Sequence, residues 1–146
     1  MPLILADLEG RASPEAVRLA ARVLEADISS RAWVAQVGYS LTQGDVAALL
    51  GRSEQAVSKD RRLLRLVRSD GRPAYPIFQF DGRRQTDGVA EVVRVLTGPL
   101  GPPAIAAWMT GRNPALGDRR PIDALRVGER EQVVGLARRL ADRAAR

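Results

Sequence analysis

The 146-residue sequence contains neither cysteine nor histidine. Without cysteine no disulfide can form, and nothing in the composition indicates secretion. The two absences together exclude the usual zinc ligand sets, the Ser-His-Asp and Cys-His nucleophile pairs, and the commonest general base of enzymes. The sequence also lacks a G-x-G-x-x-G motif and a Walker-type loop, either of which would hold a phosphate-bearing cofactor. We therefore expect a protein that is not an enzyme, with no catalytic residue, no metal and no cofactor.

Long apolar runs are missing as well. No stretch of about 18 apolar residues occurs, so we expect no membrane partner. The opening segment, MPLILADLEG, has no basic residue and soon reaches Asp7 and Glu9, unlike a signal peptide. These features predict a cytoplasmic protein. Its 45% apolar content suffices for one compact core, or for two small helical subdomains that share one.

The charge of the sequence is distributed unevenly. The net charge is +6, and all but one of the 23 basic residues are arginine. Residues 1–51 carry a net charge of −2, residues 52–84 a net charge of +5, and residues 85–146 a net charge of +3. An arginine excess caused by a GC-rich genome would be spread along the whole chain. The basic middle third therefore predicts a polyanionic partner.

The N-terminal segment 1–39 shows helical periodicity without any chemical motif. Apolar side chains recur at helical spacing over 13–27, after a Ser-Pro pair suited to a helix start. A second short helix is expected over 31–37, with Trp33 and Val37 buried. We predict helices of unassigned role, suited to packing or dimerisation.

Two capped helices are predicted in the segment that follows. Thr42 and Asp45 have the spacing of a capping box, which begins a helix that we expect to end near Leu50. Gly51 permits a tight turn after it. Ser53 then caps a second helix, expected to run to about residue 66.

The residue sizes in these two helices resemble those of the DNA-binding helix-turn-helix. Counted from Gln43, a small residue (Ala47), a glycine (Gly51) and a β-branched residue (Val57) lie where two steeply crossing helices need them. On the second helix Glu54 and four other polar residues share one face, while Ala56, Val57 and Leu63 point inward. The simpler interpretation is a solvated helix face. The predicted DNA-binding residues are Gln43, Arg52, Ser53, Gln55, Ser58, Lys59, Arg62 and Arg65.

These residues are expected to contact DNA in two ways. Gln55 and Ser58 suit hydrogen bonds to base edges, and Lys59 and Arg62 would reach guanine edges or phosphates. Further arginines are assigned to phosphates, where they add affinity without sequence information. This second group comprises Arg52, Arg61, Arg65 and Arg68.

The segment 66–80 contains an Asp-Gly hairpin signal before a short aromatic run that favours strands. Pro73 and Pro76 lack amide donors, so we expect at most a short edge hairpin there. The polar segment 81–88 is the expected linker between the two halves. The two phenylalanines of the chain are expected in the core: Phe78 and Phe80.

Further helices are predicted after this linker. Over 86–96 four apolar residues share one face, and over 102–110 a helix carries Trp108. The expected inward residues are Val89, Val92, Val93 and Leu96 in the first helix, and Ile105, Trp108 and Met109 in the second.

The segment 110–129 predicts two abrupt helix restarts before a long amphipathic helix over 129–146. Asn113 and Pro114 suit the start of a single turn that Gly117 closes. Pro121 begins another turn, and Asp123 is expected to reach back to the free amide before it.

The C-terminal sequence AIAAWMTGRNPALGDRRPIDALRVGEREQVVGLARRL resembles the toxin-binding domain of the MbcA/ParS/Xre antitoxins. That family combines a tryptophan helix, an Asn-Pro-x-Leu-Gly turn and an Arg-Pro-Ile-Asp helix start. YPIFQFDG looks like the family's linker, and a helix-turn-helix upstream is the expected arrangement. The resemblance covers roughly residues 40–146. TGRNP departs from the pattern, because the family often has a proline before this asparagine.

The resemblance implies the antitoxin of a type II toxin–antitoxin system, whose toxin is usually a RES-domain enzyme that consumes NAD. The C-terminal domain would bind the toxin and obstruct its NAD pocket, while the helix-turn-helix would repress the shared operon by binding operator DNA. Because one helix-turn-helix reads only half a site, we also expect a homodimer, within a hetero-oligomer that includes the toxin. Guanidinium groups suit pockets that hold phosphates or carboxylates. The predicted toxin-binding residues are Arg112, Arg119, Arg120, Arg138, Arg139, Arg143 and Arg146.

The sequence as a whole predicts a mainly α fold with at most one short β-hairpin. We expect N-terminal helices over 1–39, a helix-turn-helix subdomain with the hairpin over 40–80, a linker over 81–88, and a toxin-binding domain over 89–146. The alternative function is a stand-alone helix-turn-helix transcription regulator whose C-terminal half only dimerises.

Overall fold

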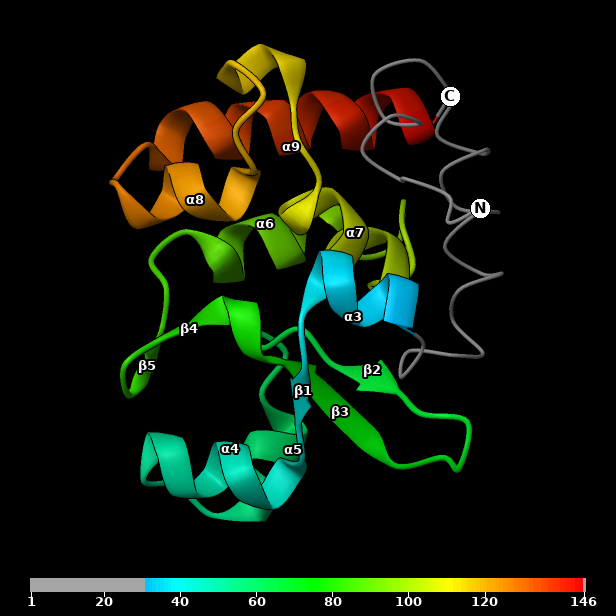
Figure 1. The fold of residues 1–146 in the computed structure, drawn as a ribbon, viewed down its shortest axis with the longest axis vertical. Helices are drawn as coiled ribbons and strands as arrows, with labels where there is room; N and C mark the ends of the chain where they lie inside the picture. The colour runs from blue at the N-terminus through cyan, green and yellow to red at the C-terminus, as the bar shows by residue number, and fades with distance from the viewer. Residues whose placement is uncertain (1–30, 146) are drawn as a thin grey trace.

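The fold is mainly helical, with a small β-sheet between two groups of helices (Figure 1). The computed structural model describes residues 31–145, and the helix predicted over 13–27 lies outside them. Helices α4 (Gln43–Leu50) and α5 (Glu54–Lys59) lie on one side of this sheet. On the other side lie α3 (Arg31–Val37), α6 (Val89–Leu96), α7 (Pro102–Thr110), α8 (Pro121–Arg126) and α9 (Arg130–Ala144).

The sheet has three antiparallel strands in the order β1-β3-β2. They are β1 (Ser40–Leu41), β2 (Leu66–Val67) and β3 (Pro73–Pro76). The prediction that the proline-containing strand lies at a sheet edge is therefore wrong, because β3 is the central strand of this sheet. Each proline occupies one end of β3, and the amide of Ile77 directly after it donates to the carbonyl of Tyr39 at 2.9 Å. The two prolines lack amide donors, but because they lie at the ends of β3, the strand still pairs with both β1 and β2.

The predicted linker 81–88 is partly folded. Strands β4 (Phe80–Asp81) and β5 (Arg84–Gln85) form a second, two-stranded antiparallel sheet after the short 3-10 helix η1 (Ile77–Gln79). The amide of Thr86 donates to the carbonyl of Gln79 at 2.9 Å, which fixes the end of this hairpin. The phenylalanines that flank Gln79 are buried, as predicted.

Two apolar clusters stabilise the fold. The smaller one lies between α4, α5 and β3, and its buried members are Val46, Ala47, Val57, Leu63, Tyr75 and Phe80. The larger one joins α3 and the sheet to the C-terminal helices. It includes Trp33 and Leu66 from before the segment 81–88 and Trp108 and Leu140 from after it. The larger cluster therefore contains residues from both sides of the segment 81–88, whereas the smaller one holds α4 and α5 against β3.

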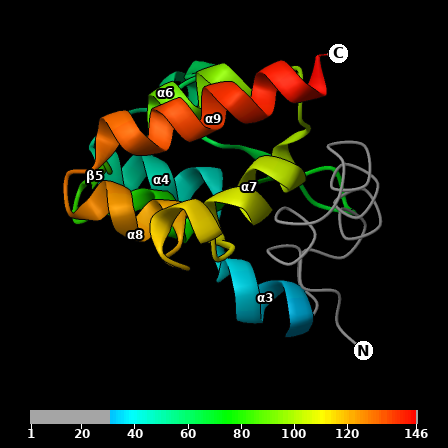
Figure 2. The same ribbon diagram turned by 90° about the horizontal axis from the view of Figure 1, so that it is seen from above.

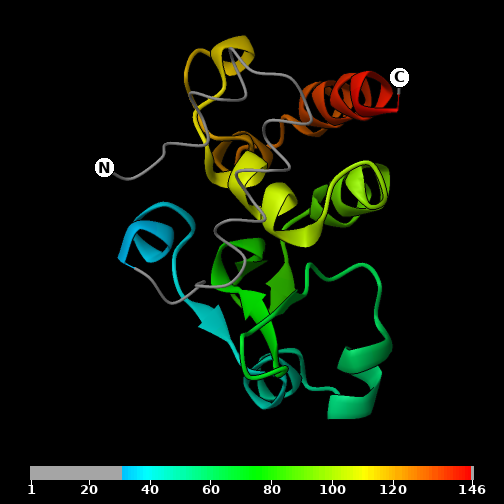
Figure 3. The same ribbon diagram turned by 90° about the vertical axis from the view of Figure 1, so that its right-hand side faces the viewer.

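Helices α6 and α9 pack against each other (Figure 2), and α9 lies at the end of the molecule opposite α4 (Figure 3). The four apolar residues expected on one face of α6 are all buried, although α6 begins at Val89 rather than at residue 86. A further 3-10 helix, η2 (Pro114–Leu116), precedes α8. The side chain of Asn113 caps it by accepting from the amide of Ala115 at 3.0 Å, as the sequence predicts.

The expected role of Asp123 is wrong. Its carboxylate accepts from Nε and Nη2 of Arg120 at 2.7 and 2.9 Å, and no side chain caps the start of α8. A two-point bond between guanidinium and carboxylate is stronger than a single bond to a neutral amide. The start of α8 therefore depends on Pro121 and on packing, with Ile122 and Leu125 buried.

We expect Gly88→Ala to destabilise the fold, because Gly88 has a φ of +92° and lies against α8. An added Cβ would lie 2.7 Å from Cδ2 of Leu125 and 3.3 Å from Cγ of Arg130. Backbone strain and overpacking together should lower the free energy of unfolding by about 2–4 kcal/mol, measured by urea denaturation.

Gly82→Ala is the matched control for this substitution. Gly82 also has a positive φ, +62°, but a Cβ there would meet no heavy atom of the described residues within 4 Å. Only the strain of about 1–2 kcal/mol should remain. Equal losses for the two variants would show that the contact between Gly88 and α8 is unimportant.

Candidate functional site

Helices α4 and α5 are bounded by the caps that the sequence predicts. The Thr42 hydroxyl accepts from the amide of Asp45 at 3.0 Å, and the Asp45 carboxylate accepts from the amide of Thr42 at 3.2 Å. Gly51 ends α4 in the left-handed region with φ of +64°. Ser53 then begins α5, because its hydroxyl accepts from the amide of Ala56 at 3.1 Å. A three-residue turn thus separates two short helices.

The two helices cross closely because small residues lie between them. Ala47 and Val57 are buried in the smaller core, as the spacing from Gln43 predicts. The first residue of α4, Gln43, is half-buried. The polar residues Gln55, Ser58 and Lys59 are all exposed on α5. The arrangement therefore presents one short polar helix to solvent and keeps its apolar side against α4.

Helix α5 ends at Lys59, so the expected end near residue 66 is wrong. Asp60 is its C-cap and has extended backbone angles, which turn the chain away from the helix axis. Leu63 is then buried in the smaller core and Leu64 in the larger one. In a continued helix, both residues would instead remain part of α5. Arg62 consequently does not lie on α5, and its predicted place on the helix face is wrong.

Asp60 binds two of the arginines that were predicted to contact DNA. Its carboxylate accepts from Nε and Nη2 of Arg62, both at 3.0 Å, and from Nη1 of Arg52 at 2.6 Å. The Asp60 side chain is only 6% exposed. The hydrogen bond from Arg62 and the one from Arg52 lower the pKa of this carboxyl well below its usual range, against the opposing effect of burial. Arg52 and Arg62 therefore partly neutralise Asp60.

A buried glutamine holds the chain after α5 in place. Oε1 of Gln79 accepts from the amide of Leu64 at 2.8 Å, and Nε2 donates to the carbonyl of the same residue at 2.9 Å. Neither Gln79 nor Asp60 was among the residues predicted from the sequence. The signal for Gln79 was a single amide in the aromatic run IFQF, and for Asp60 a single carboxylate beside Arg61 and Arg62.

The C-terminal arginines divide into paired and unpaired groups. Arg119 forms an ion pair with Glu129 at 2.7 Å, and Arg138 forms one with Glu91 at 3.3 Å. Arg120 is bound by Asp123 as described above. In the described part of the chain, three of the predicted residues form no ion pair, and Arg146 lies outside that part. The unpaired residues are Arg112, Arg139 and Arg143.

Two of the unpaired arginines lie beside a cavity of about 360 Å³ between α9 and the η2 turn. Arg139, Leu140 and Arg143 of α9 line it together with Trp108 of α7. Asn113, Pro114, Ala115 and Leu136 complete the lining. The cavity thus combines apolar side chains with two positive charges.

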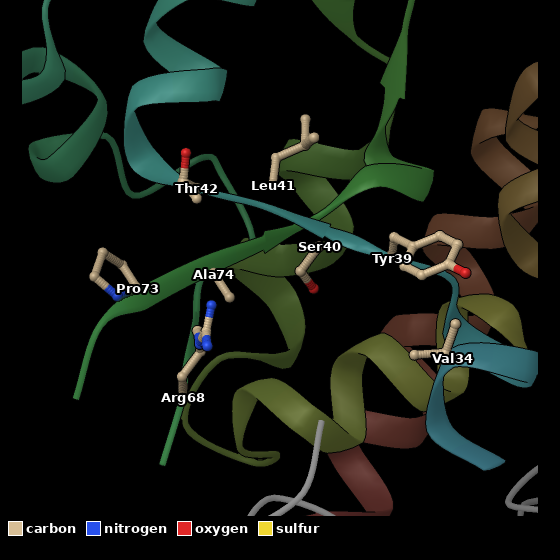
Figure 4. Close-up of a pocket in the computed structure, with 8 residues that line it drawn as sticks. All are labelled: Val34, Tyr39, Ser40, Leu41, Thr42, Arg68, Pro73 and Ala74. Carbon is tan, nitrogen blue, oxygen red and sulfur yellow. The ribbon is translucent and has the colours of Figure 1, made fainter. Parts of the chain in front are cut away.

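A smaller cavity, of about 210 Å³, lies over the sheet beside α3 (Figure 4). It is lined by Val34, Tyr39, Ser40, Leu41, Thr42, Arg68, Pro73 and Ala74. Its single cation, Arg68, forms an ion pair with Asp70 at 3.5 Å. A mainly apolar cavity with one paired cation does not suit a polyanion, so this cavity is not the predicted interface.

No protein-family model, curated protein or solved structure matches the chain. In the described residues, none of the helices is both long enough and apolar enough to cross a bilayer.

We expect Asp60→Asn to lower the free energy of unfolding in a pH-dependent way. The pKa of Asp60 is lower in the folded protein than its ordinary value, so its stabilising effect is present above about pH 4. The effect is lost as the pH falls through the lower folded-state pKa. Urea denaturation should show a constant difference from wild type between about pH 7 and pH 5, which narrows below about pH 4.

Asp70→Asn is the control for an exposed pair, since the Asp70 side chain is 45% exposed beside Arg68. Its effect should stay below about 1 kcal/mol. An Asp60→Asn effect no larger than this, or one unchanged down to about pH 2.5, would contradict the assigned role of Asp60.

Proposed function

We propose that the protein is the antitoxin of a type II toxin–antitoxin pair. In this proposal it binds operator DNA through α5 as a helix-turn-helix protein and neutralises a RES-type, NAD-consuming toxin through its C-terminal arginines. It has no catalytic activity of its own and acts in the cytoplasm. The sequence resemblance to the MbcA/ParS/Xre antitoxins supports the identity of the toxin.

The observation that carries the proposal is the short polar helix α5 held across α4. Ala47 and Val57 are buried between α4 and α5, and Gly51 ends α4 with a positive φ, which are the properties that the residue pattern of a helix-turn-helix requires. Gln55 and Ser58 offer hydrogen-bonding groups for base edges, and Lys59 offers a positive charge. Arg65 is exposed beyond the helix and suits a phosphate.

The proposed DNA contacts differ from those expected from the sequence alone. Arg52 and Arg62 are engaged by Asp60, so they position the turn around α5 and contribute less to direct base contact. The Ser53 hydroxyl is engaged in the helix cap. Gln55, Ser58 and Lys59 therefore form the proposed base-reading group.

One helix-turn-helix contacts one half-site, and two half-sites lie about 34 Å apart. We therefore propose a homodimer within the complex with the toxin. Helix α9 and its unpaired arginines lie at the opposite end of the molecule from α4 and α5 (Figures 1 and 3). This separation favours simultaneous binding of DNA at one end and toxin at the other.

The cavity beside α9 supports the proposed toxin contact. Arg139 and Arg143 have no carboxylate partner among the described residues, and they flank an apolar surface. An unpaired guanidinium can form a two-point bond with a carboxylate or phosphate of a partner. Arg119, Arg120 and Arg138 would first have to leave their own carboxylates, so we assign them a smaller role.

For DNA binding, we expect Lys59→Ala and Gln55→Ala each to weaken binding to the promoter of the protein's own operon by about 1–3 kcal/mol and to relax base preference. Arg65→Ala should weaken binding to all sequences alike and reduce the salt slope by about one unit. Fluorescence anisotropy at several salt concentrations measures both quantities.

Arg143→Ala on α9 is the matched control, because it removes the same charge at the far end of the molecule. Its affinity for the promoter should stay close to that of wild type. The assignment of α5 as the recognition helix fails if Lys59→Ala and Arg143→Ala behave alike.

For neutralisation, we expect Arg139→Glu combined with Arg143→Glu to abolish rescue of cells that express the toxin from the neighbouring gene. The reason is that the two substitutions reverse the charge of the cavity rim beside α9. Growth after co-expression measures rescue, and circular dichroism verifies the fold.

Arg83→Glu combined with Arg84→Glu makes the same change of charge on the exposed β4–β5 hairpin. This control should rescue fully. Loss of rescue only in the control would place toxin binding at the hairpin. Promoter binding without any rescue by the wild-type chain would favour a stand-alone transcription regulator.

A further inference from the structure

A third cavity lined by basic residues, of about 620 Å³, lies between the end of α5 and helices α6 and α7. Its volume is in the range of small-molecule sites, about 300–1,000 Å³, and far exceeds the space that one phosphate needs. We call it the α5–α7 cleft and define it by Lys59, Arg61, Arg65, Thr97, Pro102 and Ile105. Of the residues that line this cleft, the DNA contacts proposed above use Ser58, Lys59 and Arg65, and they give the apolar part of the cleft no role.

The rim of the cleft carries an excess of positive charge. Lys59, Arg61 and Arg65 are exposed, and within residues 31–145 none of them forms an ion pair. The one carboxylate of the lining is Asp60, whose charge is already bound by two other arginines. The rim therefore suits an anionic group with several acceptor oxygens, and phosphate has this character.

The floor of the cleft is apolar. Leu63, Leu64, Val93 and Ile105 line it and are buried against the two cores. The first two residues of α7 are prolines, Pro102 and Pro103, which have no amide hydrogen to donate to an anion. The positive charges lie at the rim, so the rim suits the anionic group, and the floor suits an uncharged, planar or aliphatic part of the same ligand.

From this combination we infer that the α5–α7 cleft binds a small phosphate-bearing molecule with an apolar or planar portion, of the class of nucleoside monophosphates. The phosphate lies between Arg61, Arg65 and Lys59. The uncharged part lies over the floor, beside Thr97 and Pro102.

The position of the cleft gives such a ligand a regulatory consequence. Lys59 belongs both to the rim of the cleft and to the exposed face of α5. A bound phosphate would engage Lys59 and place negative charge beside α5, so the ligand and DNA should compete. This competition depends on the proposed DNA binding, whereas the binding of the ligand itself does not.

Isothermal titration of the full chain with adenosine monophosphate, in the absence of DNA, tests the inference. Saturable binding at one site per chain is expected, with adenosine and inorganic phosphate each at least about tenfold weaker. Arg61→Ala combined with Arg65→Ala should weaken binding of adenosine monophosphate at least about tenfold. Thr97→Trp should abolish it by filling the cleft without a change of charge.

Two matched variants control for charge and bulk outside the cleft. Arg72→Ala combined with Arg83→Ala removes two exposed charges, and Ser69→Trp adds an indole in the turn before β3. Both should bind adenosine monophosphate within about twofold of wild type, since diffuse attraction between exposed charges is weak. Equal weakening by both charge-removing variants would overturn the inference, and so would unsaturable binding or equally tight binding of inorganic phosphate.

A second measurement separates the ligand site from the proposed function. Adenosine monophosphate should weaken promoter binding by the wild type but not by Thr97→Trp, whose affinity for DNA without ligand should be unchanged. Ligand binding without any effect on DNA would support the site and overturn the competition. Ligand binding in a chain that binds no promoter would support the site and refute the proposed DNA binding.

Discussion

The side-chain amide of Gln79 is the interaction on which the arrangement of the two helical groups depends. It is completely buried and satisfies both the amide and the carbonyl of Leu64, fifteen residues earlier in the chain. A buried backbone group without a partner would cost about 1–3 kcal/mol. Gln85 extends the network by donating to Gln79 at 3.2 Å and to the carbonyl of Arg62 at 2.7 Å. Because this network fixes the chain directly after α5, it orients α4 and α5 relative to the body.

A second constraint is the sharing of a few carboxylates among many arginines. The pKa of Glu91 is lowered chiefly by its hydrogen bond from Arg130, and its other arginines act in the same direction. Within residues 31–145, such pairs engage ten arginines. Three carboxylates hold most of the paired arginines: Asp60 with Arg52 and Arg62, Glu91 with Arg94, Arg130 and Arg138, and Asp123 with Arg120 and Arg126.

Among the described residues, five cations without a carboxylate partner line two cavities, one at the end of α5 and one along α9. Lys59, Arg61 and Arg65 surround a cleft with an apolar floor, and Arg139 and Arg143 flank an apolar cavity. Arginines held by carboxylates stabilise the fold, whereas unpaired cations beside apolar surface can bind anionic partners. The proposed functions follow from this division rather than from the total charge.

The sequence by itself determined the features that depend on residues a few positions apart. The capping box at Thr42, the turn at Gly51 and the Asn113 cap all lie where the sequence predicts them, because their hydrogen bonds close within one helical turn. The tertiary structure decided the rest. Gln79 holds the chain after α5 at Leu64, and Arg126 of α8 donates a hydrogen bond to the carbonyl of Phe78, 48 residues away. Local spacing carries no information about partners at such separations, so only the packed chain shows which arginines are bound and which are free.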